Sequence, residues 1–308
     1  MSNFYGFLEL LKGPFKILSQ NGRLMAIIAI IYLMLYSLSF ILFTYTTNPF
    51  ITDFVLKLFS LPSARPGTPE YTNILISIRD DIGIFLGIEG AYAIFYFFVV
   101  VFAQTSVIII ASCYYNGNNN LSFNELMLKV SKTWSRPFVT LFYIHLLAGG
   151  YSTLFFLPFL VPTLVLFDHR VILVTVLTLL AILFITFYIY LSVVWSLAVV
   201  VSVNEDTYGL LALGKARELV KGNRVPGFFL NFLCLLVMGF IFVFGSKLSP
   251  SMPIIVGNIE FICIGLVSMF QFMAYSGFYY QCKNNTTKSR GLEYSQIPTA
   301  VVLSEDIP

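Results

Sequence analysis

Six long apolar stretches constrain this chain more than any other feature of its sequence. They cover approximately residues 24–44, 82–113, 137–159, 171–203, 225–245 and 254–280. An α-helix needs about 20 predominantly apolar residues to cross the hydrocarbon core of a bilayer. Lipid offers no partner to backbone N–H and C=O groups, so each stretch must satisfy its own by forming a helix. The sequence therefore predicts an all-α membrane protein with six transmembrane helices.

Composition argues against a soluble protein of the same length. The chain is 58% hydrophobic and 11% charged, whereas a soluble domain carries about 25% charged residues. Two soluble domains could not hide this much apolar surface from water, but a bilayer can solvate it. The stretches at 82–113 and 171–203 are longer than one crossing requires, so we expect these helices to tilt, bend or protrude.

The basic residues predict the orientation of the chain. Most of the 18 Lys and Arg residues fall in segments on the same side of the membrane as the N-terminus. Because such residues concentrate on the cytosolic side, we expect both termini in the cytosol, at either an endomembrane or the plasma membrane. The first apolar stretch has no cleavage pattern and is kept as a span. We interpret residues 1–281 as one membrane domain and 282–308 as a flexible cytosolic tail.

A unit of pattern occurs three times. An amphipathic helix, a span, an outer turn and a second span follow one another from Phe4, from Ser122 and from Thr207. This order predicts three helical hairpins, each preceded by an amphipathic interfacial helix on the cytosolic surface. Ser122 and Glu125 have the spacing of a capping box at the start of the second amphipathic helix.

Local signals refine the first unit. Pro14 is expected to break or bend the first amphipathic helix, and Asn21 with Gly22 to end it. The middle of the segment 45–81 is rich in Pro and Gly and is interpreted as a loop, with short surface helices such as 50–59 beside it.

The sequence also predicts the cap and the faces of the third amphipathic helix, which begins near Thr207. Asp206 or Thr207 is expected to cap its N-terminus. Its apolar face should hold Leu211, Ala212, Ala216, Leu219 and Val220. Lys215 falls on the apolar side of the helical wheel, where it can either snorkel to the surface or pair with Glu218; we favour snorkelling.

Basic residues beside the second and third amphipathic helices are candidate contacts for lipid headgroups, because headgroup phosphates lie at this depth. They are Lys129, Lys132, Arg136, Arg217, Lys221 and Arg224.

Ionisable residues inside the spans are the candidates for an intramembrane polar site. Glu89, His145 and Glu260 lie within apolar stretches, where a charged side chain costs about 3 kcal/mol at the bilayer centre. The sharper interpretation is a shared polar cavity that contains Glu89 and His145. The alternative, which we favour, gives these groups a purely structural role, in which each one snorkels to the interface or forms a hydrogen bond with a neighbouring helix. Gln104 and Gln271 are similarly expected to form interhelical hydrogen bonds.

Signatures of catalysis are missing from the sequence. With only His145 and His169, no paired-histidine metal motif exists, and no P-loop, Gly-x-Ser-x-Gly or dinucleotide fingerprint occurs. We therefore expect no enzyme activity, no cofactor and no metal, and the basic residues at membrane edges do not form a nucleic-acid surface. Cys113 and Cys282 lie at cytosolic span ends, where they are either unmodified or S-acylated; we favour unmodified thiols.

One stretch carries a family resemblance. Residues 201–223 contain Val-Ser-Val, the acidic pair Glu205-Asp206, Tyr-Gly, Ala-Leu and the run from Lys215 to Gly222. In these residues, and in its six-span layout over residues 4–283, the chain resembles a plant family of uncharacterised multi-span membrane proteins. The resemblance implies that architecture. It implies no catalytic residue, because the family has no established activity.

Three functions are consistent with the sequence. The preferred one is a non-enzymatic membrane protein whose cytosolic interfacial helices act on lipids or on protein partners. The alternative is a small-solute transporter or channel that uses Glu89, His145 and Glu260, with Gly149 and Gly150 as a second motivation. A membrane-embedded enzyme is the least favoured, because it needs a cluster of reactive groups that the sequence does not display.

Overall fold

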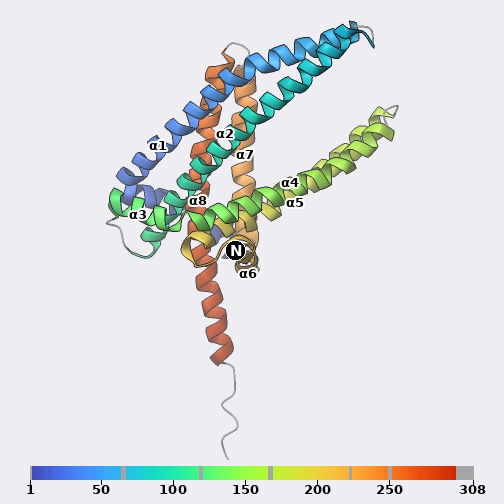
Figure 1. Cartoon of the computed structure of the whole chain (residues 1–308). Helices are drawn as coiled ribbons and strands as arrows, with labels where there is room; N and C mark the ends of the chain where they lie inside the picture. The colour runs from blue at the N-terminus through green and yellow to red at the C-terminus, as the bar shows by residue number, and fades with distance from the viewer. Residues whose placement is uncertain are drawn as a thin grey trace, which may run out of the picture.

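The computed structural model describes residues 2–63, 67–117, 121–165, 169–221, 224–248 and 252–295, and this described part is entirely helical apart from its turns. The helices, shown in Figure 1, are α1 (Ser2–Ser60), a short 3₁₀ turn η1 (Leu61–Ser63), α2 (Pro69–Tyr115), α3 (Phe123–Thr133), α4 (Ser135–Val165), α5 (Arg170–Asn204), α6 (Gly209–Val220), α7 (Arg224–Leu248) and α8 (Pro253–Ser295). The prediction of an all-α chain is confirmed.

Six of these helices are long and apolar enough to cross a membrane. They are α1, α2, α4, α5, α7 and α8. Each contains one of the predicted stretches, and α1, α2 and α8 extend well beyond theirs because the flanking residues remain compatible with a helix. The two short helices, α3 and α6, lie between spans.

Consecutive long helices pack along each other as three pairs, α1 with α2, α4 with α5, and α7 with α8. Figure 1 shows that α4 with α5 and the outer parts of α1 and α2 diverge from a common region near α3 and α6, whereas α8 remains packed against α1. Along the diverging parts, large apolar side chains such as Leu56, Phe156 and Val171 are exposed. Exposure of this kind is typical of a surface solvated by lipid hydrocarbon.

The common region, which we call the packed end, is the hydrophobic core of the molecule. Consecutive residues are buried on every face of α2 (105–112), α5 (197–202) and α8 (272–279), and these segments belong to one cluster of buried residues. A helix buried on all sides must be surrounded by other elements. Here α1, α3, α6 and α7 supply the covering.

Helix α1 reaches the packed end through a kink that only partly matches the expectation. The backbone leaves helical geometry at Asn21 (φ −114°, ψ 25°), as predicted, but the helix continues through Pro14. Pro14 is tolerated because neighbouring helices cover this segment; Gly13 lies so close to Tyr115 of α2 that an added Cβ would stand 2.6 Å from its hydroxyl.

The loop expected in the middle of the segment 45–81 is shorter than its Pro- and Gly-rich sequence indicates, and residues 50–59 are helical as expected but continue α1 instead of forming a separate surface helix. Helix α1 runs to Ser60 and α2 begins at Pro69, with the Thr68 hydroxyl accepting a hydrogen bond from the Tyr71 N–H. The ammonium of Lys57 lies 2.5 Å from the Asp81 carboxylate and ties the two helices together. The loop signal of Pro and Gly is therefore confined to the short connection between them.

At the other end of the chain, α8 continues to Ser295. The first part of the segment 282–308, predicted to be an aperiodic tail, is thus helical, and residues 296–308 lie outside the described residues.

The starts of α3 and α6 are built differently. At α3, the capping box is confirmed: the Glu125 N–H donates to the Ser122 hydroxyl, and the Ser122 N–H donates to the Glu125 carboxylate. At α6, the predicted cap by Asp206 or Thr207 is wrong, since the helix begins after Tyr208 without a side-chain cap.

A glycine and a neighbouring helix replace that cap. Gly209 has a φ of +60°, which favours glycine, and its N–H donates to the hydroxyl of Thr140 in α4 over 2.9 Å. The expected apolar face of α6 is confirmed for Ala212, Ala216 and Val220, which are buried, but not for Leu211, which is 71% exposed.

Candidate functional site

The three ionisable groups expected inside the membrane are not brought together. His145 is exposed, and its Nδ1 lies 2.8 Å from the carbonyl oxygen of Leu141 in its own helix. Its ring meets Phe97 edge-on, with centroids 5.4 Å apart. Glu260 packs against α7, its carboxyl filling the space beside Gly245 that a Cβ would occupy. Glu89 is partly buried in α2.

Within the described chain, no hydrogen bond or ion pair joins any two of Glu89, His145 and Glu260. Gly149 and Gly150 are exposed, and nothing lies within 4 Å of where their Cβ atoms would be. The transporter alternative depended on these groups converging, and their separate packing gives it no support.

The structure instead builds a polar network around Asn231 of α7. Its Nδ2 donates to the Ser192 hydroxyl of α5 over 2.6 Å, and its Oδ1 accepts from the Tyr275 hydroxyl of α8 over 2.6 Å. The Gln271 amide donates to the same oxygen over 3.2 Å. Gln271 therefore forms an interhelical hydrogen bond as predicted, whereas the Oε1 of Gln104 has no partner among the described groups.

Sequence reasoning missed Asn231, although a signal was present. It is the sole amide side chain in the apolar stretch 225–245, and a polar residue in a span normally faces the protein interior. Asn231 is buried and Tyr275 is completely buried. The network joins three helices and satisfies both ends of the Asn231 amide, so it serves to hold α5, α7 and α8 in register.

A second polar cluster surrounds Glu205, the residue that follows α5. Its carboxylate forms an ion pair with Lys215 of α6 and accepts a hydrogen bond from the Tyr279 hydroxyl of α8 over 2.6 Å. The Lys283 ammonium donates to that hydroxyl over 3.3 Å. The expectation that Lys215 snorkels is wrong. From its position on the apolar side of α6, the Lys215 ammonium reaches the Glu205 carboxylate. Neither snorkelling nor pairing with Glu218 predicted this partner.

The surroundings of Glu205 favour the charged form of its carboxyl group. Burial acts to raise the pKa of its carboxyl group, but the hydrogen bonds from Lys215 and Tyr279 and the charges of Lys215 and Lys283 outweigh burial and lower it. Glu205 is therefore an anion at neutral pH that fixes α6 to α8.

The six candidate headgroup contacts fall into two groups. Three have partners: Arg136 forms an ion pair with Asp206 at 2.6 Å, the Lys129 ammonium lies 3.6 Å from the Cys113 sulfur, and the Arg224 guanidinium lies over the Tyr190 ring. The other three, which are exposed and have no ion-pair partner within the described part of the chain, are Lys132, Arg217 and Lys221.

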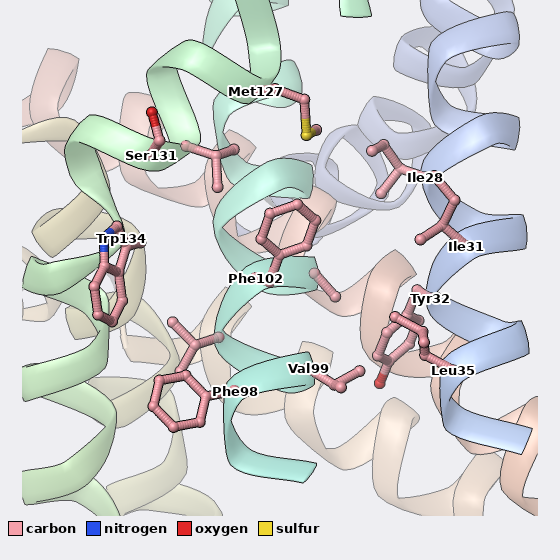
Figure 2. Close-up of a pocket in the computed structure, with 13 residues that line it drawn as sticks. Ile28, Ile31, Tyr32, Leu35, Phe98, Val99, Phe102, Met127, Ser131 and Trp134 are labelled. Carbon is pink, nitrogen blue, oxygen red and sulfur yellow. The ribbon is translucent and has the colours of Figure 1, made fainter. Parts of the chain in front are cut away.

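An apolar groove opens beside α3. It has a volume of about 610 Å³ and is walled by α1, α2, α3 and the residue that ends α3, Trp134. In Figure 2, Phe98 and Phe102 of α2 stand between Trp134 on one side and Tyr32 of α1 on the other. The side-chain hydroxyls of Tyr32 and Ser131 and the indole N–H of Trp134 are the polar groups among its described lining residues. Such a groove accepts hydrocarbon and disfavours charged ligands.

The described residues contain no group of three or more His, Cys, Asp or Glu side chains arranged to hold a metal ion. Cys113 is partly buried and Cys282 is buried, and both have free thiols.

Six long apolar helices in an all-α chain are the features of a multi-pass membrane protein. The chain belongs to the family described as "Domain of unknown function (DUF8558)", whose model matches residues 2–290. Membership of an uncharacterised family, predicted from residues 201–223, is thereby confirmed. Neither a characterised protein nor a solved structure gives a significant match.

Proposed function

We propose that this protein is a non-enzymatic multi-pass membrane protein that binds anionic lipid headgroups through the short helices at its packed end. The observation that carries the proposal is the placement of Lys132 on α3 and of Arg217 and Lys221 on and after α6, all exposed and without acidic partners among the described residues. Unpaired surface charge beside an apolar span attracts anionic lipid by about 1 kcal/mol per residue.

The faces of α3 and α6 support an interfacial position. Each helix has one face buried in the packed end, through Leu126 and Val130 on α3 and through Ala212 and Ala216 on α6. On the exposed side, apolar residues accompany the basic ones: Leu128 precedes Lys132 by one turn, and Leu210 precedes Arg217 by two. Leucines would enter the acyl boundary while the cations reach the phosphates, as in interfacial helices generally.

The proposal includes three like-oriented hairpins with the packed end on the cytosolic side, because the basic residues of α3 and α6 lie there. It predicts that a glycosylation acceptor engineered into residues 63–69 is used and that one placed after residue 288 is not. The mobility shift of the glycosylated chain after expression with microsomes reads this out. Modification of the second site alone would reverse the orientation.

The lipid interaction is tested with the triple variant Lys132→Gln, Arg217→Gln, Lys221→Gln. We expect its preference for phosphatidylserine over phosphatidylcholine to fall by about 1 kcal/mol per charge removed. Reconstituted protein and brominated lipids measure this preference, since Trp134 is 41% exposed and is quenched by adjacent bromine.

The matched control is Arg170→Gln, Lys247→Gln, which removes two exposed charges at the far ends of α5 and α7. It should retain the preference of the unaltered protein. Equal lipid preference in the triple variant and the unaltered protein would refute the proposed function.

A further inference from the structure

A second apolar groove lies between α5 and α7, and it differs from the one beside α3 because a cation lies on its rim. It has a volume of about 340 Å³, within the range of small-ligand sites, about 300–1,000 Å³. Val193 of α5 and Phe228 and Phe229 of α7 form apolar walls, and Arg224 lines it at the start of α7.

Close packing at Gly227 fixes the spacing of the two helices that form the groove. Gly227 brings α7 so near to α5 that an added Cβ would lie 2.7 Å from a methyl group of Val193 and 3.2 Å from the Phe278 ring of α8. This contact fixes the spacing of the helices, while Val225 and Phe229 remain exposed on the outer wall. The distance between α5 and α7 at the groove is therefore set by this close approach of the two helices.

Arg224 is placed to bind an anion. Its guanidinium lies 5.8 Å from the centroid of the Tyr190 ring, which orients it across the groove. No carboxylate of the described residues forms an ion pair with it. The planar guanidinium can donate two parallel hydrogen bonds to a phosphate, a geometry that an ammonium lacks. Lys221, exposed at the end of α6, adds positive charge nearby.

We propose that this groove binds one anionic glycerophospholipid, with its phosphodiester on Arg224 and the first part of one acyl chain against Val193, Phe228 and Phe229. The inference rests on the membrane position of the packed end in the proposed function. A phosphate at the rim and hydrocarbon in the groove match the charge at the start of α7 and the apolar residues that follow it.

The test uses the full chain, purified in detergent, stripped of lipid and titrated with phosphatidylglycerol or phosphatidylcholine under native mass spectrometry. We expect one equivalent of phosphatidylglycerol to bind at least about tenfold more tightly than phosphatidylcholine, and Arg224→Gln to remove this difference. Arg224→Lys, which keeps the charge and loses the fork of donors, should retain part of it.

Two further variants distinguish the contribution of the Arg224 charge to lipid binding from that of the apolar groove. Val225→Trp narrows the groove at an exposed position without altering charge, and should weaken phosphatidylglycerol binding as Arg224→Gln does. Arg23→Gln removes an exposed cation of α1 that lies outside the groove and should bind as the unaltered chain does. Equal thermal midpoints verify folding of every variant.

Three outcomes would overturn the inference: an unaltered chain that binds no added phosphatidylglycerol, an Arg224→Gln chain that binds phosphatidylglycerol normally, or competition by glycerol phosphate at equal concentration, which would indicate a site for free phosphate. The proposed function fails separately. If the chain binds lipid in detergent but shows no preference for anionic lipid in bilayers, only the proposed function is refuted. If it shows that preference in bilayers but binds no lipid in detergent, only this inference is refuted.

Discussion

Replacing Asn231 by leucine is expected to lower the free energy of unfolding by about 2 kcal/mol, because the buried hydroxyl of Tyr275 and amide of Gln271 lose their shared acceptor. Leucine is similar in size, so the cost arises from unsatisfied polar groups and not from a cavity. Reversible unfolding in mixed micelles with increasing dodecyl sulfate measures the change. Tyr275→Phe, which removes one hydrogen bond and keeps the packing, should cost about 1 kcal/mol.

Asn73→Leu is the matched control. Asn73 is exposed near the start of α2, so the same substitution there should leave the unfolding midpoint close to that of the unaltered protein. An Asn231→Leu variant as stable as this control would show that the network contributes nothing to holding α5, α7 and α8 together.

Replacing Glu205 by glutamine should loosen α6. The substitution removes the charge that pairs with Lys215 and accepts from Tyr279, and we expect a loss of about 1 kcal/mol because Lys215 is half exposed to solvent. Hydrogen exchange of the α6 backbone (Gly209–Val220) reports this local opening. Exchange in α6 should accelerate about fivefold at neutral pH, while the centre of α8 is unaffected.

The same carboxylate predicts a pH dependence. Because the folded protein lowers the pKa of Glu205 below the ordinary value of 4.5, its contribution is present above pH 4.5 and is lost as the pH falls through the lowered pKa. Opening of α6 should therefore increase in acid in the unaltered protein, and Glu205→Gln should abolish that increase. Glu218→Gln, at an exposed position of the same helix, should leave it intact; an acid response unchanged in Glu205→Gln would assign it to another group.

Features that depend on neighbouring residues in the chain were predictable. The six candidate spans follow from the length of each apolar stretch, because lipid forces each such stretch to form a helix. The capping box of Ser122 and Glu125 and the kink at Asn21 are likewise local, and both are present. The loop expected in the middle of the segment 45–81 was too long, because its turn residues are concentrated in a few positions between two helices that pair by packing and by Lys57 and Asp81.

The sequence by itself determined that this chain is all-α, with six helices long and apolar enough to span a membrane and with basic residues beside two short helices, because hydropathy and helical period are properties of consecutive residues. Only the tertiary structure decided which polar groups meet. Asn231 finds partners about 40 positions away on either side, in Ser192 and Tyr275, and Glu205 finds Lys215 and Tyr279. Glu89, His145 and Glu260 remain apart, since the rotation and crossing of helices depend on side-chain packing between segments distant in sequence.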